Sequence, residues 1–220
     1  MKTTIDHLVI VAPDLDTGCT FVTGALGVDL QPGGVHSRMG THNRLLHLGP
    51  ALYLEVIAVD PCAKRPDRAR WFGLDQRGPH SPAYLATWVA RTDDIHAARH
   101  ACPDIVGDVE PMTRGTLDWQ ITIPADGNLP LAGSAPTLIQ WAHGPHPAST
   151  LQDKGCSLLA LDVFHTDPEK IKAILTAMNF SGPVHLHALE DASTPYLLAH
   201  IQTPSGLKIL PLSRESHASS

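Results

Sequence analysis

The chain has 220 residues, of which 43% are hydrophobic and only 17% are charged, which is the balance of an ordered globular protein. A formal charge of −6 leaves no basic surplus for binding phosphate backbones, so nucleic acid is not an expected partner. No apolar segment approaches the roughly 20 residues of a membrane helix, and the N-terminus leads into a predicted strand rather than a signal peptide, so we expect a cytoplasmic protein without a membrane partner.

The first predicted strand, residues 4–12, carries Asp6 and His7 near the start of an apolar, β-branched run. A turn with an aspartate as N-cap then leads into a predicted helix over residues 17–26, and Gly27 ends it. Ionisable groups in a buried strand need compensation, because an unpaired charge is costly to remove from water. The first unit is therefore a strand followed by a helix, with two polar groups that require partners.

Three further strands are predicted after this helix. A short strand at residues 28–31 and a turn at 32–34 lead to a strand at 41–48, and a last strand at 51–58 carries Glu55 as its one acid. A buried carboxylate pairs, becomes protonated or binds a cation. The histidine of the first strand is the partner that the sequence offers, and the two groups together are also the beginning of a metal site.

The same order of elements recurs twice more along the chain, which predicts an α+β fold of repeated β-α-β-β-β modules. An odd number of modules leaves one sheet without a partner, and proteins cover open sheet edges. We therefore expect the third unit to pack against the first two or to take part in a homodimer contact. The predicted units are a first module at residues 1–58, a linker at 59–81, a second module at 82–147, a third module-like unit at 154–212 and a tail at 213–220.

The linker combines several basic residues with an aromatic pair that begins at Trp71. One interpretation is an exposed connection whose aromatic side chains fold back onto the core. The other is a flap, in which Trp71 packs at the rim of a pocket and excludes water. In that case nearby arginines stay in solvent and draw anionic substrates toward the pocket. These arginines are Arg65, Arg68 and Arg70.

Several short motifs within residues 5–75 resemble one known family. They are Asp6-His7-Leu-Val, Leu26-Gly27-Val28, Gly33-Gly34-x-His36, Gly40-Thr41-His42-Asn43, Tyr53-Leu54-Glu55 and Arg70-Trp71-Phe72-Gly73-Leu74. In these the chain resembles the glyoxalase-like domain proteins of the vicinal oxygen chelate superfamily. The resemblance implies modules whose strands curl into half-barrels of one mixed sheet, with two modules enclosing a small-molecule site. It also implies a divalent metal held by the first and fourth strands of each module.

Carried over residue by residue, the resemblance places His7 and Glu55 at the two ligand positions of the first module. The second module offers Gln140 on its fourth strand and neither His nor Glu on its first. The implied ligands of a divalent Zn, Mn, Fe or Ni ion are therefore His7, Glu55 and Gln140, and the implied affinity is modest. His7 and Glu55 are then expected to face one cavity.

The remaining candidates for substrate binding are His36, His42, Asn43, Trp71 and Gln140. Because side chains alternate along a strand, His42 and Asn43 are expected on opposite faces. Two histidines in the Pro-rich tail of the second module, His143 and His146, are expected on the surface.

Two functions stay open at this stage. The first is an isomerase, lyase or dioxygenase type of enzyme, in which Glu55 or His7 moves a proton and a bound metal or water polarises a small oxygenated substrate. The alternative is a metal-free protein that binds or sequesters a small molecule, in which His7 and Glu55 only hydrogen-bond each other.

Overall fold

The computed structural model describes residues 1–142 and 144–210. His143, the last two residues of the predicted third unit and the predicted tail at 213–220 lie outside the described residues. The described strands form two sheets, one of eight strands and one of four. None of the described helices is both long and apolar enough to cross a membrane.

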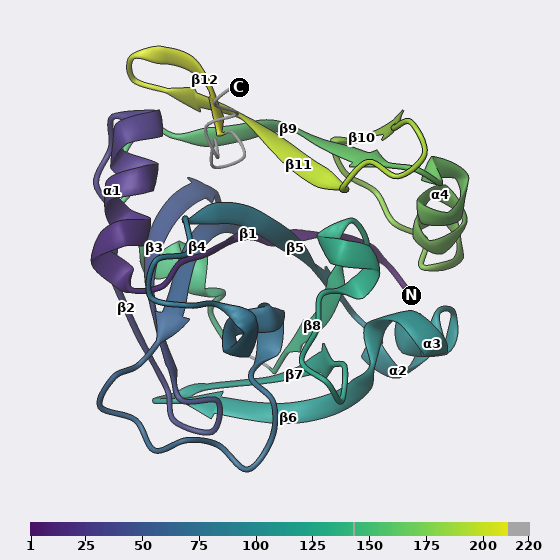
Figure 1. Ribbon diagram of the computed structural model, residues 1–220, viewed down its shortest axis with the longest axis horizontal. Helices are drawn as coiled ribbons and strands as arrows, with labels where there is room; N and C mark the ends of the chain where they lie inside the picture. The colour runs from purple at the N-terminus through teal and green to yellow at the C-terminus, as the bar shows by residue number, and fades with distance from the viewer. Residues whose placement is uncertain (143, 211–220) are drawn as a thin grey trace.

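The large sheet has the strand order β2-β3-β4-β1-β5-β8-β7-β6. The first strands of two modules, β1 and β5, pair antiparallel at its centre, and each pairs in parallel with the fourth strand of its own module. Figure 1 shows this sheet curled into a ring-like half-barrel, which confirms the predicted α+β fold of repeated modules. Its strands are β1 Thr3–Val11, β2 Gln31–His36, β3 Thr41–Gly49, β4 Leu52–Val59, β5 Tyr84–Thr92, β6 Asp108–Arg114, β7 Leu117–Ile123 and β8 Thr137–Trp141.

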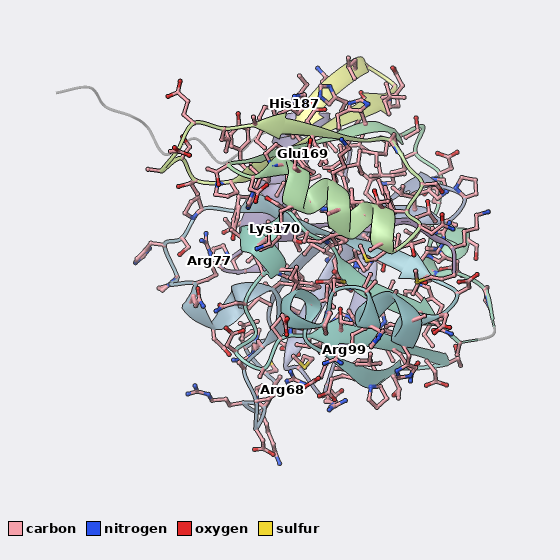
Figure 2. All side chains as sticks on the ribbon, turned by 90° about the vertical axis from the view of Figure 1, so that its right-hand side faces the viewer. Arg68, Arg77, Arg99, Glu169, Lys170 and His187 are labelled. Atoms are coloured by element: carbon pink, nitrogen blue, oxygen red, sulfur yellow. The ribbon has the colours of Figure 1, made fainter. Side chains whose placement is uncertain are left out.

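The small sheet is built from β9 Ser157–His165, β10 Val184–Ala188, β11 Tyr196–Thr203 and β12 Gly206–Leu210. It keeps the chain order of a module but not its pairing, because β9 lies between β10 and β11 in the order β10-β9-β11-β12. The sheet lies across the outside of the half-barrel, above β1 and β5 in Figure 1. Figure 2 shows His187 on the outer side of this sheet, with α4 and its Glu169 and Lys170 beside it.

Aspartate caps the start of three of the described α-helices. The side chain of Asp14 accepts a hydrogen bond from the backbone N–H of Thr17 at 2.7 Å, and Gly27 ends the same helix in the left-handed conformation with φ 71°. Asp94 and Asp167 cap later helices in the same way. The α-helices are α1 Leu15–Leu26, α2 Ile95–His100, α3 Pro103–Val106 and α4 Pro168–Ala177, and the 3-10 helices are η1 Trp71–Gln76, η2 Pro130–Gly133 and η3 Pro147–Thr150.

One local prediction was wrong. The second strand occupies Gln31–His36 instead of residues 28–31, and the Gly33-Gly34 pair lies within it instead of forming a turn. A side chain on Gly33 would place its Cβ 2.0 Å from Asn43 Oδ1, and one on Gly34 would place it 2.7 Å from Arg114 Cδ. The glycines are therefore required because polar side chains of neighbouring strands pass directly over them.

Apolar side chains fill both faces of the large sheet. The convex face packs against the small sheet and the helices, with Leu8, Trp88, Leu161 and Leu197 among the buried residues. The concave face holds a second cluster that includes residues of η1, which lies inside the ring in Figure 1. The candidate site is on this concave side.

Candidate functional site

A small cavity lies on the concave face between the two modules. The first module contributes polar side chains to it, and the second contributes mainly aromatic and aliphatic ones. Its free space is about 20 Å³, which is room for about one water molecule or one ion. The polar lining residues are His7, His36, Asn43, Glu55 and Arg114, and the others are Tyr53, Trp71, Phe72, Trp119, Ile121, Ile139 and Trp141.

His7 is oriented by its neighbour in the sequence. The pairing of β1 with β5 shifts register between Ile5 and His7, so Asp6 is the extra residue of a β-bulge. In a regular strand two adjacent side chains would point to opposite faces, but here His7 Nδ1 lies 2.6 Å from Asp6 Oδ1. Both side chains are buried. The bulge therefore creates a carboxylate–imidazole pair from consecutive residues.

Asp6 is surrounded by hydrogen-bond donors. Its Oδ2 accepts from Trp141 Nε1 and from His146 Nε2, each at 2.9 Å, and Arg91 Nη1 lies 4.0 Å away. Burial alone would raise the pKa of Asp6, but the hydrogen bonds from His146 and His7 outweigh it and hold this pKa far below the usual 3.8. The expected surface position of His146 is therefore wrong.

The protonation of the His7 ring follows from this environment. An ionised carboxylate can only accept, so Nδ1 of His7 carries the hydrogen that is donated to Asp6. The other ring nitrogen, Nε2, lies 3.7 Å from Glu55 Oε2. The ring of Tyr53 stacks on the imidazole at 4.5 Å between centroids and fixes its plane. The second ring nitrogen of His7 is thus directed at the carboxylate of Glu55.

Asn43 links Glu55 to the rest of the polar wall. Its Nδ2 donates to Glu55 Oε1 at 2.5 Å, and its Oδ1 accepts from the backbone N–H of Gly34 at 2.7 Å. The same Oδ1 is 3.3 Å from Arg114 Nη1, which comes from the second module. One amide therefore holds an acid of the first module and a cation of the second in the same wall.

His36 stays neutral in this wall. Burial first, and the adjacent guanidinium of Arg114 second, lower the pKa of His36 to about 3. Arg114 Nη1 donates to its Nε2 at 3.2 Å, and Nδ1 is 3.1 Å from Thr41 Oγ1. His36 therefore acts as a hydrogen-bond acceptor for Arg114 and not as a second cation.

The linker forms part of the cavity wall. The rings of Trp71 and Phe72 stack with their centroids 5.5 Å apart, and the rings of Trp71 and His36 meet in a T-shaped arrangement with their centroids 5.1 Å apart. Both aromatic side chains are buried against the cavity. Arg70 is buried as well, with Nη1 2.6 Å from Asp75 Oδ1, so its expected place in solvent is wrong. The same linker leaves Arg65 exposed.

Two of the candidate residues lie away from the cavity. Gln140 Oε1 accepts from the backbone N–H of Ile95 at 2.8 Å, at the start of α2. Its neighbours Ile139 and Trp141 line the cavity, so alternation along β8 turns Gln140 to the opposite face. In β3, Asn43 lines the cavity and His42 does not, for the same reason.

Sequence reasoning missed Arg114, Tyr53 and the role of Asp6. Tyr53 lies two residues before Glu55, and this spacing could have placed it on the same face of β4. Asp6 gave no such signal, because alternation predicts that it points away from His7. Arg114 lies 71 positions from Asn43 along the chain, and only the meeting of β6 with β2 brings the two together.

The donor set does not fit a tightly held divalent ion. Zinc in catalytic sites usually has three protein ligands. Here His7 Nε2 and Glu55 Oε2 are the two donors that face each other, and Glu55 Oε1 is already bound by Asn43. Within residues 1–142 and 144–210 no group of three or more His, Cys, Asp or Glu side chains could hold a metal ion. What the arrangement offers without a metal is a buried imidazole and a carboxylate that can exchange a proton.

Comparisons with known proteins agree with this architecture. The model of the glyoxalase-like domain matches residues 5–178. No curated protein matches the chain. A hypothetical protein from Staphylococcus aureus has a similar structure, with a TM-score of 0.62 and 16% identity over 90% of this chain and 91% of that one. This likeness shows a shared fold.

Two further structures match less of the chain. Methylmalonyl-CoA epimerase from Mycobacterium tuberculosis has a TM-score of 0.40 and 20% identity, over 66% of this chain and 91% of that one. A variant of the Streptomyces coelicolor methylmalonyl-CoA epimerase, in complex with 2-nitronate-propionyl-CoA, has a TM-score of 0.41 and 21% identity over 65% of this chain and 97% of that one.

Proposed function

Because the chain belongs to the glyoxalase-like domain family, we propose that its concave cavity binds one small oxygenated molecule and moves a proton on it. The observation that carries the proposal is the approach of His7 Nε2 to Glu55 Oε2, 3.7 Å apart, inside one cavity. Proton transfer by positioned side chains is worth about 10²–10⁴-fold in rate. An isomerase or lyase type of reaction needs this chemistry.

The acid–base pair is His7 and Glu55. One of them takes a proton from the carbon next to a carbonyl group, and the pair returns it to that carbon or to its neighbour. Asp6 keeps the hydrogen on His7 Nδ1 and so keeps Nε2 available as a base. Burial, with the Asp6 and Glu55 carboxylates next in effect, raises the pKa of Tyr53 well above 10, so Tyr53 supports the ring as a neutral phenol.

Entry of a substrate requires the linker to shift. The cavity has about 20 Å³ of free space, and even a small organic molecule needs more. Trp71 and Phe72 come from the segment that covers it, and Phe72 has a positive φ of 58°, which is unusual for a residue other than glycine. When the segment closes again, the aromatic pair excludes water from the acid–base pair.

Hydrogen exchange tests this proposal directly. A panel of small ketones, hydroxy ketones and 2-oxo acids is incubated with protein in D₂O after dialysis against EDTA, and loss of the proton next to the carbonyl is followed by ¹H NMR. We expect at least one class of compound to exchange faster than in buffer. Glu55→Gln and His7→Gln should lower this rate by about 100-fold or more.

His42→Gln is the matched control, because His42 is also a histidine of the first module but does not line the cavity. It should keep the wild-type rate. The proposal is wrong if no compound exchanges faster than in buffer, or if Glu55→Gln keeps the full rate.

The metal-free binding protein is the second candidate. It is favoured by the apolar wall of Trp119, Ile121, Ile139 and Trp141, because these four side chains bring no acid or base to the cavity. Such a wall suits a molecule that is held without being changed. Tryptophan fluorescence distinguishes the two functions, because a binding protein shows saturable quenching by panel compounds without any exchange in D₂O.

A further inference from the structure

Arg114 is a cation in the cavity wall that has no acidic partner. It is the last residue of β6, and its side chain lines the same cavity as His7 and Glu55. Among the described residues no carboxylate oxygen lies within 4.0 Å of its nitrogens. Other arginines of this end of the molecule are paired, namely Arg38 and Arg68 with Glu110 and Arg70 with Asp75.

The partners that Arg114 does have are neutral and engage only one of its nitrogens. Nη1 contacts Asn43 Oδ1 at 3.3 Å and His36 Nε2 at 3.2 Å. A guanidinium carries five N–H donors in a fixed fork. Within the described residues, Nη2 and Nε make no hydrogen bond to protein. These donors are free for a ligand, and they have the geometry that binds a carboxylate through two parallel hydrogen bonds.

The neighbouring strand β2 restricts the position of the Arg114 side chain. A Cβ on Gly34 would lie 2.7 Å from Arg114 Cδ, so the arginine stem lies flat against the β2 backbone. The backbone N–H of the same glycine holds Asn43 Oδ1 at 2.7 Å, and Asn43 in turn contacts both Glu55 and Arg114. The guanidinium is therefore held at a fixed place relative to the acid–base pair.

We propose that Arg114 binds a carboxylate of the substrate, and that the substrate class of this cavity is a small oxygenated acid such as a 2-oxo acid. The inference rests on the proposed function, because it assigns the substrate of that same cavity. A 2-oxo acid bound in this way has its carboxylate at Arg114, and its carbonyl group and adjacent C–H bond reach toward His7 and Glu55. Because His36 is neutral, Arg114 is the one fixed positive charge among the residues that line the cavity.

The test compares an acid with a neutral analogue of similar size. Exchange of the protons next to the carbonyl is measured in D₂O for pyruvate and for hydroxyacetone, with the wild type and with Arg114→Gln, Arg114→Lys and Arg65→Gln. The wild type should prefer pyruvate. Arg114→Gln should raise the half-saturating concentration of pyruvate about 10- to 100-fold and abolish this preference, and Arg114→Lys should restore it in part.

Arg65→Gln is the control for charge, because Arg65 is exposed on the linker and its loss changes the net charge equally. It should keep the preference for pyruvate. Gly34→Ala displaces the guanidinium without removing it and should weaken pyruvate binding as well. Its control is Gly24→Ala, where a Cβ meets no atom within 4 Å.

Binding is also measured by tryptophan fluorescence in Glu55→Gln, so that the result does not depend on catalysis. If pyruvate binds this variant and Arg114→Gln in the same background weakens it, the assignment of Arg114 holds even when no exchange is seen and the proposed function fails. Equal binding of pyruvate with and without Arg114, or no binding of pyruvate to either the wild type or Glu55→Gln, overturns the inference. If the wild type exchanges the protons of hydroxyacetone as fast as those of pyruvate, the assignment of Arg114 is overturned and the proposed function still stands.

Discussion

A carboxylate without any exposed surface, such as that of Asp6, is stable only where donors surround it. One donor is the adjacent His7 in β1, and the other two, Trp141 at the end of β8 and His146 in the segment that follows, lie 135 and 140 positions away along the chain. This single side chain therefore ties the two modules together and also fixes the hydrogen on the His7 ring. Structure and chemistry depend on the same group.

Asp6→Asn keeps the shape of the Asp6 side chain and removes its negative charge. An asparagine NH₂ can donate to His7 Nδ1, which moves the ring hydrogen to Nε2 and removes the base from the cavity. We expect the exchange rate in D₂O to fall about 10- to 100-fold. The free energy of unfolding should fall by about 1–3 kcal/mol. Rates from NMR and urea unfolding curves check the two effects.

Asp67→Asn provides the comparison, since Asp67 is exposed on the linker. It should change neither quantity. A folded Asp6→Asn variant with the wild-type exchange rate would show that the orientation of His7 does not matter for the reaction.

The elements show how irregular backbone serves the cavity. The bulge in β1 turns two consecutive side chains toward each other, and the register shift in β2 lies beside its glycine pair.

The small sheet has a polar cluster of its own, in which Asp162 of β9 lies between histidines of both neighbouring strands. The distances from its oxygens are 3.1 Å to His185 Nδ1, 3.3 Å to His187 Nε2 and 2.7 Å to His200 Nε2.

Asp162 predicts a pH dependence of stability. Burial alone would raise its pKa, but the surrounding histidines, His200 first, outweigh this and lower the pKa below 3.8. A carboxyl whose pKa is lowered by folding stabilises the protein above the unfolded value, and that stability is lost as the pH falls through the folded value. Asp162→Asn should therefore cost about 1 kcal/mol near neutral pH and nothing once the pH is well below 3.8.

Urea unfolding between pH 7 and pH 2 measures this difference. Asp191→Asn is the control, because Asp191 is exposed in the same part of the chain. A constant difference between Asp162→Asn and the wild type over the whole pH range would contradict the prediction.

At the scale of the whole molecule, the two modules of the half-barrel contribute different kinds of side chain to the cavity. The first supplies His7, Asn43 and Glu55, and the second supplies an apolar wall with Arg114 at its rim. The small sheet stays outside this site and packs its inner face against the convex side of the half-barrel. Its outer face exposes Leu159, Leu207 and Ile209, which are large apolar residues with about half of their surface in solvent.

A homodimer through this outer face stays a prediction. Exposed apolar side chains grouped on one sheet favour association, and a second copy of the same sheet offers a matching face. Sedimentation equilibrium should give a dimer for the wild type and a monomer for a variant with Leu159→Asp and Leu207→Asp. Val35→Asp, at an exposed apolar residue of β2, is the control and should remain dimeric. A monomeric wild type at micromolar concentration would refute the prediction.

The sequence alone determined the elements and the first candidates. Helix ends at Asp14 and Gly27, the strands of alternating or apolar character and the repeated order of elements follow from local sterics and capping, which act over a few residues. His7 and Glu55 could be singled out because an ionisable group in an apolar strand needs compensation. The packing of Trp71 against a pocket was one of the two interpretations that the linker sequence allowed.

Only the tertiary structure decided which side chains meet. A one-residue bulge directs Asp6 toward His7, strand alternation turns Gln140 toward α2, and the approach of β6 to β2 delivers Arg114. The pairing of the small sheet, with β9 between β10 and β11, also differs from that of the two modules it resembles in chain order. Register, bulges and strand order depend on contacts between residues that are far apart in the sequence. A local sequence pattern does not predict the free energy of these contacts.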